Sequence, residues 1–299
     1  MIKLNTENLV ERGVDVKVVN LVSVPPVGRH RKNVSVESLP FCGISYNVRL
    51  GDPVFGWSED LIEPGIIAAV HTGDHSSPCP GNGLPGICSI GNKVKIITGE
   101  APGLEGVLVG KSFAVPDAVI IDFPERVYQK LTAGDHLWIL ARGRRSMFAE
   151  YPSIQCYGID PEVLNKFELQ QAGRTRLMTP VCFFMTPDYF TPIDEKHFVP
   201  QLLCSFHGAD SREMQKLGIG NMRFGDLIAI TDLDCTDGFN KQQGAVTIGM
   251  VTLSPVAVWD IAFGVSVLLT CSEGRIVPVI NPSANIGHHL GVGRFRRLI

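Results

Sequence analysis

The segment GNKVKIITGEAPGLEGVLVGK, residues 91–111, contains the pattern that decides the fold of this chain. Two short runs rich in β-branched residues, KVKIIT (93–98) and GVLVG (106–110), flank a stretch with glycine and proline. Runs of this length suit strands, and Gly and Pro between them favour turns. The segment therefore predicts two strands joined by a loop.

The same pattern continues on both sides of this segment. Glycine occurs 31 times and proline 20 times in 299 residues, with short apolar runs between them. The other predicted strands are 14–20, 44–50, 65–70, 118–121, 136–141, 227–231, 245–253, 265–270 and 275–280. Many short strands with regular turn signals predict a mainly β (β-rich α+β) protein of barrel- or sandwich-like modules with a few short helices. A doubly wound fold would need longer helical patterns between the strands.

Helical signals are found at 124–131, 160–171 and 281–291. Asp160 is a favourable N-cap, Pro161 suits the first helical position, and Gly291 suits the end of the last helix. The second predicted helix breaks at QAGRTRLMTP (171–180). We therefore predict two β-rich domains, 1–175 and 176–299, or else one intertwined unit.

Composition excludes several classes of function. The formal net charge is −3, and the basic residues form no face with interleaved aromatics, which argues against nucleic-acid binding. No apolar stretch approaches the roughly 20 residues of a membrane span. The N-terminus MIKLNTENLVERG is polar, and the eight cysteines include no CxxC pair. These features predict a cytoplasmic protein in a reducing compartment.

The segment HTGDHSSPCPGNG (71–83) is the first candidate site. It follows a predicted strand, and loops at strand ends commonly carry ligands on a rigid scaffold. His71, Asp74 and His75 are the predicted ligands of a divalent metal, zinc or similar. Their spacing matches no recognised zinc motif, so a polar surface turn is the alternative.

Two further groups supply candidate catalytic residues. His207 ends a predicted strand in SFHGADSREMQ (205–215), and Asp232 and Asp234 lie in TDLDCTDG (231–238). Alternate strand residues point the same way, so the two aspartates are predicted to chelate a cation together or to provide a general base. A histidine satisfied by its neighbours and a charged hairpin turn are the alternatives.

The segment 86–111 contains two features that resemble reactive motifs. Cys88 in GICSIGN lies among small residues and is read as a packed residue rather than a nucleophile. GLEGVLVGKS resembles a phosphate-binding loop, but its glycine spacing is wrong and no strand–loop–helix context surrounds it. We therefore predict no nucleotide site.

Several of these blocks resemble the domain-of-unknown-function 4438 family of bacteria and archaea. The resemblance rests on GICSIGNKVKIITGEAPGLEGVLVGK, AGDHLWILARG, MRFGDLIAITDLD and GAVTIGMVTLS, and extends over about 40–295. The β-rich body of that family is similar to acetamidase/formamidase-type metal-dependent amide hydrolases, a likeness of fold alone.

The resemblance also implies a difference in one block. Relatives tend to carry a histidine, an acid and a GHGPG run after the GAVTIG strand. This chain has VTLSPVAVWDIAFGVSV (251–267) there, retaining only Asp260 and Gly264. A site formed at those positions in relatives is therefore expected to be altered or lost.

Together these features favour a metal-dependent hydrolase of a small amide or related C–N bond. His71, Asp74 and His75 would hold the metal, while Asp232, Asp234 and His207 would provide proton transfer. The alternatives are a non-catalytic small-molecule-binding or regulatory β-module, and a lyase or isomerase using the same His/Asp set. We also expect a homo-oligomer in which the apolar segment 251–269 forms a subunit face, unless that segment is simply core.

Overall fold

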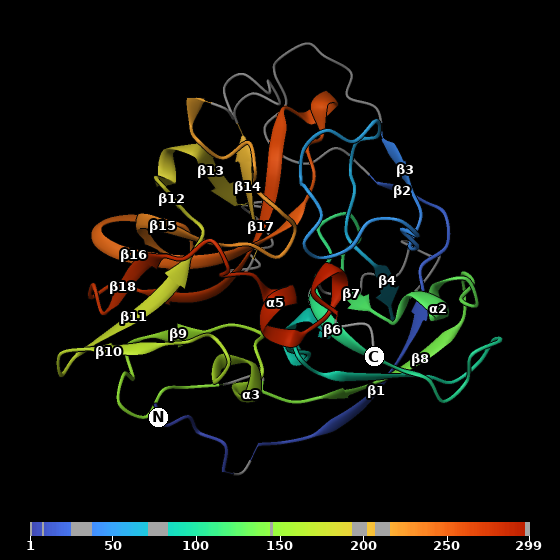
Figure 1. The fold of residues 1–299 in the computed structure, drawn as a ribbon, viewed down its shortest axis with the longest axis horizontal. Helices are drawn as coiled ribbons and strands as arrows, with labels where there is room; N and C mark the ends of the chain where they lie inside the picture. The colour runs from blue at the N-terminus through green and yellow to red at the C-terminus, as the bar shows by residue number, and fades with distance from the viewer. Residues whose placement is uncertain are drawn as a thin grey trace.

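The computed structural model describes residues 2–7, 9–24, 38–70, 83–143, 146–192, 202–206 and 216–296. The chain is mainly β, with short helices between strands, as the sequence predicts (Figure 1). Two sheets dominate: a closed barrel from the first half of the chain and a seven-stranded sheet mostly from the second. No helix in these ranges is long and apolar enough to cross a membrane.

The barrel closes in the order β1-β4-β7-β6-β5-β8, and its neighbouring strands are antiparallel. Its strands are β1 (Arg12–Val18), β4 (Ile66–Ala69), β5 (Lys93–Ile96), β6 (Glu105–Lys111), β7 (Ala118–Asp122) and β8 (His136–Ala141). In β5, buried Val94 and Ile96 alternate with exposed Lys93 and Lys95. This alternation fills the barrel with apolar side chains, as expected for a strand with one face in a core.

One extra residue in β6 changes which side chains face the inside of the barrel. Leu108 pairs with Ile121, but Gly110, not Val109, pairs with Ile120, so the register shifts by one residue between them. A bulge of this kind reverses the alternation beyond it. Gly110 therefore faces outward, where an added Cβ would lie 3.3 Å from Met250 Cε of the large sheet.

The large sheet has the order β12-β15-β16-β17-β14-β13, with β9 paired to β17. Its strands are β9 (Gln155–Cys156), β12 (Phe183–Met185), β13 (Phe190–Pro192), β14 (Leu202–Phe206), β15 (Leu227–Asp234), β16 (Asn240–Leu253) and β17 (Ile261–Cys271). Every residue of β17 is buried, and so is Trp259 before it. The apolar segment 251–269 is therefore largely core of this chain.

Smaller elements complete the fold. Two small sheets are β2 (Val22–Val24) with β3 (Leu39–Phe41), and β10 (Gln170–Ala172), β11 (Arg176–Val181) and β18 (Ile276–Ile280). The helices are α1 (Gly83–Ile87), α2 (Glu125–Tyr128), α3 (Pro161–Leu164) and α5 (Ile286–Leu290), with 3-10 turns η1 (Pro187–Tyr189), η2 (Ala257–Trp259) and η3 (Gly293–Phe295).

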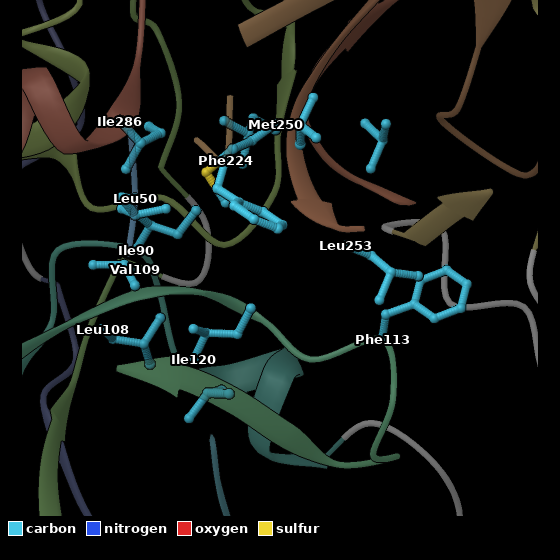
Figure 2. Close-up of a cluster of buried hydrophobic side chains, with 14 of the residues drawn as sticks. Leu50, Ile90, Leu108, Val109, Phe113, Ile120, Phe224, Met250, Leu253 and Ile286 are labelled. Carbon is cyan, nitrogen blue, oxygen red and sulfur yellow. The ribbon is translucent and has the colours of Figure 1, made fainter. Parts of the chain in front are cut away.

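The two sheets share one hydrophobic core. Figure 2 shows Leu108 and Phe113 of the barrel half gathered with Met250 and Leu253 of the large sheet, and all four belong to one buried cluster. The backbone also crosses between the halves, because Gly51 N donates to Phe224 O at 2.8 Å and Arg294 N donates to Leu50 O at 2.9 Å. The halves 1–175 and 176–299 are therefore joined by a shared core and by backbone hydrogen bonds.

Two local predictions are wrong for identifiable reasons. The segment 44–50 is not a strand, because the Arg49 guanidinium donates to the carbonyls of Ser45, Tyr46 and Val48 and curls the chain around itself. The helix predicted over 160–171 ends at Leu164, because residues 170–172 instead pair with β11. The Asp160 N-cap is confirmed, as its carboxylate accepts from Glu162 N at 2.9 Å.

We expect alanine to be far costlier at Gly91 than at Gly103. Both glycines have positive φ (+98° and +84°), so Ala strains the backbone by about 1 kcal/mol at each. At Gly91 the new Cβ would also lie 2.3 Å from Val163 Cγ2, whereas nothing lies within 4 Å at Gly103. Overpacking of this kind costs about 1–3 kcal/mol more.

Urea unfolding of Gly91→Ala and Gly103→Ala measures this difference directly. Equal losses of unfolding free energy in the two variants would show that the loop carrying Gly91 is not packed against Val163 as described.

Candidate functional site

Lys111, the last residue of β6, faces the inside of the barrel. Its register partner is Val119, which pairs with Ala68, which in turn pairs with Val18. Side chains of directly paired residues lie on the same face of a sheet. Val18 belongs to the buried set that alternates with more exposed residues in β1. The lysine therefore lies among apolar residues that fill the barrel.

The Lys111 amine is enclosed by a loop and by the residue that follows α1. A Cβ added to Gly158 would lie 2.7 Å from Nζ and 3.5 Å from the carbonyl oxygen of Cys88. The loop that carries Gly158 is held against the segment that follows Cys88, because Ile90 N donates to the Gly158 carbonyl at 2.8 Å. Lys111 is 3% exposed, and among the described residues Nζ has no hydrogen-bond partner.

Burial changes the protonation of the groups around this amine. Desolvation lowers the pKa of Lys111 to about 7, and the neighbouring Cys88 opposes this shift by a smaller amount. Desolvation raises the pKa of the Cys88 thiol to about 12, with Lys111 lowering it by a smaller amount. Near neutral pH a large fraction of Lys111 is therefore a neutral amine beside a protonated thiol.

A buried amine without a partner is expensive to keep. Removing an ammonium group from water costs several kcal/mol unless a charge or hydrogen bonds replace the water. Next to Cys88, the Ser89 hydroxyl is also buried and without a partner in the described structure. Unsatisfied groups with a shifted pKa are typical of functional sites, where such a cost is retained for chemistry.

A second buried ionisable group, Glu63, contacts the residues that directly follow Lys111. Its carboxylate accepts from Ser112 Oγ at 2.6 Å, from Phe113 N, and from Ala114 N at 3.3 Å. Desolvation raises its pKa to about 7 in spite of these three donors. Because the donors follow Lys111 directly, Glu63 fixes the backbone just after the end of β6, where the lysine side chain is attached.

Four of the residues predicted from sequence lie outside the described residues: His71, Asp74, His75 and His207. Their roles stay predictions. The described strand β4 ends at Ala69, which pairs with Ala118, next to the register partner of Lys111. The chain therefore enters the segment 71–82 from the end of the barrel that holds the amine.

Asp232 and Asp234 do not point the same way, so that part of the prediction is wrong. Asp232 lies at a register shift of β15 with φ +57°, is exposed, and accepts from Gly244 N at 2.7 Å. Asp234 is buried and accepts from Thr236 Oγ1 at 2.7 Å. The bulge breaks the two-residue alternation on which the prediction depended. Their role in proton transfer stays a prediction.

Within the described ranges, no three His, Cys, Asp or Glu side chains group so that they could hold a metal ion. The described structure instead singles out Lys111, which sequence reasoning considered only as part of a rejected phosphate-loop pattern. The sequence shows only that a lysine ends the apolar run GVLVGK (106–111). The register shift that turns it inward has no signature in one sequence.

Comparison with known proteins finds two models of domains of unknown function and a solved structure. The model of the N-terminal domain of unknown function DUF4438 matches residues 30–165, and that of its C-terminal domain matches 204–290. A solved structure titled "Crystal structure of TM1086" is 27% identical, with a TM-score of 0.78, covering 97% of this chain and 99% of that one. No curated protein matches.

We expect Lys111→Met to be more stable than the natural chain near pH 7, and its advantage to shrink as the pH rises. The Lys111 pKa is about 7 when folded against an ordinary value of 10.5, so between these values the unfolded chain binds the proton more tightly. Folded stability therefore rises with pH across that window, by roughly 1 kcal/mol per pH unit, and Met lacks this gain.

Urea unfolding at pH 7.5, 8.5 and 9.5, values chosen within roughly that window, measures the difference between the two chains. Lys95→Met is the matched control, because Lys95 is exposed on β5 of the same barrel. A difference for Lys111→Met that stays constant with pH would contradict the description of a buried neutral amine.

Proposed function

The chain belongs to the DUF4438 family, and we propose that it is an enzyme acting on small carbonyl compounds, with Lys111 as a covalent amine nucleophile. Of the activities considered from sequence, this is the lyase or isomerase class. The observation that carries the proposal is the buried Lys111 Nζ, which has no partner among the described residues and lies inside the barrel.

The chemistry follows from the protonation state of the amine. A neutral lysine amine adds to a carbonyl carbon, and loss of one water from the adduct gives an imine. Once protonated, the imine draws electrons from a neighbouring C–H or C–C bond, so that this bond breaks more easily. Hydrolysis of the imine consumes one water and returns the free amine.

The surroundings of Lys111 support this use of the amine. The apolar barrel keeps a large fraction of Lys111 neutral near pH 7, whereas an exposed lysine is almost entirely protonated there. The Cys88 thiol has its pKa raised to about 12, so it is a poor nucleophile in comparison. The arrangement therefore favours attack by nitrogen over attack by sulfur.

We expect propanal with sodium cyanoborohydride to label Lys111 covalently. Reduction of the imine gives a stable secondary amine that peptide mass spectrometry locates. Labelling of Lys111 relative to an exposed lysine should be highest near pH 7 and fall as the pH rises, because Lys111 is already largely neutral there while the neutral fraction of an exposed lysine still increases.

Lys95 in the same digest is the internal reference, because it is exposed on the same barrel. Lys111→Met should lose the labelled peptide and keep labelling at Lys95. Labelling confined to exposed lysines would overturn the proposal. Binding of propanal-like ligands without labelling would favour the non-catalytic small-molecule-binding alternative.

The metal-dependent hydrolase is the second candidate function. It is favoured by the position of the Ala69 end of β4, because the segment with His71, Asp74 and His75 begins at the end of the barrel that holds Lys111. A divalent ion there would lower the pKa of a bound water to about 7 and supply hydroxide for attack on an amide.

For this candidate we expect about one equivalent of zinc or a similar ion in the purified protein, as one site would bind. His71→Ala with His75→Ala should remove the ion, measured by elemental mass spectrometry. His136→Ala is the control, since His136 lies on β8 paired with Asp15 at 3.2 Å. A metal-free protein that gains no amidase activity on addition of zinc would exclude the hydrolase.

A further inference from the structure

The residues in register with Lys111 offer no second positive charge to a ligand. The residues in register with the lysine, Val119, Ala68 and Val18, are apolar and buried. Cys88, the ionisable neighbour of Lys111, is an uncharged thiol near neutral pH because burial raises its pKa to about 12. A ligand carboxylate placed beside the amine would therefore have the amine as its counter-ion.

Arg142, which lies at this end of the barrel, is already neutralised. Arg142 directly follows β8, and its backbone bonds to Asn92, which precedes β5. Its guanidinium donates to Asp160 at 2.7 Å and forms an ion pair with Glu162 at 2.6 Å. Asp160 N also donates to Ile90 O at 2.9 Å, and Ile90 N bonds to Gly158, so turning Arg142 to a ligand would leave a buried carboxylate unpaired beside the site.

We propose, resting on the function proposed above, that the substrate is a small uncharged aldehyde or ketone rather than an oxo acid. A carboxylate entering the barrel would pair with the protonated form of Lys111 and hold it there, because an unpaired carboxylate is costly in an apolar site. A protonated amine cannot attack a carbonyl. An uncharged carbonyl compound leaves the amine neutral and pays no such desolvation cost.

The unpartnered Ser89 hydroxyl fits the same substrate class. Its backbone N donates to Asn92 Oδ1 at 2.8 Å, which fixes Ser89 beside Cys88, while its Oγ is buried and unused in the described structure. A hydroxyl both donates and accepts one neutral hydrogen bond, so it suits a hydroxyl or carbonyl group of a substrate. It gives a carboxylate only one weak donor.

Pyruvamide and pyruvate test this inference, because they are ketones of nearly equal size that differ in charge. Each is incubated with the full-length protein and sodium cyanoborohydride at about pH 7.5. At this pH more than about half of Lys111 is neutral, because its pKa is about 7. The measured quantity is the ratio of labelling at Lys111 to labelling at exposed Lys95, which corrects for the different reactivity of the two ketones.

We expect this ratio to be at least about tenfold higher for pyruvamide, as one pKa unit of added protonation would give. Equal ratios, or a higher ratio for pyruvate, would overturn the preference for uncharged substrates and leave the covalent amine standing. No labelling of Lys111 by either ketone or by propanal would overturn both proposals together.

Discussion

The register shift in β6 is the constraint on which the rest of the arrangement depends. Because Gly110 takes the position across from Ile120, it faces the large sheet, and Lys111 faces the inside of the barrel. Without the extra residue the alternation would bring the lysine to the outside and the glycine inward. The same shift lets the two sheets approach, since Gly110 presents no side chain to Met250 and Thr252.

Two buried ionisable groups, Lys111 and Glu63, lie at the residues that follow this bulge and differ in how their hydrogen-bonding capacity is satisfied. Glu63 accepts three hydrogen bonds from consecutive residues 112–114 and ties the barrel to the segment beside the large sheet. Lys111 has none within the described structure. A buried carboxylate with several hydrogen-bond donors is typical of structural support. A buried amine without a hydrogen-bond partner is typical of a group retained for chemistry.

The shared core explains why these features can persist. Segments of the first half bond to the second half at Leu50 and Gly51, and the chain end at Arg294 returns to bond there as well. The Arg296 guanidinium also reaches the buried Asp122 at the end of β7. An unfavourable buried amine needs surroundings that cannot rearrange around it, and a barrel clamped by the rest of the chain provides them.

The sequence was enough to predict the β-rich class, most strand positions, the Asp160 and Gly291 caps and the family, because apolar periodicity, turn residues and capping are local properties. It misplaced 44–50 and paired Asp232 with Asp234, because a guanidinium bonding to nearby carbonyls and a bulge both interrupt alternation without a clear signature. The closed strand order, the shared core and the inward turn of Lys111 were decided by tertiary structure alone. Each depends on which strands pair, although these strands are far apart in the sequence. Each also depends on the register of that pairing, because a shift of one residue places a side chain on the opposite face of the sheet.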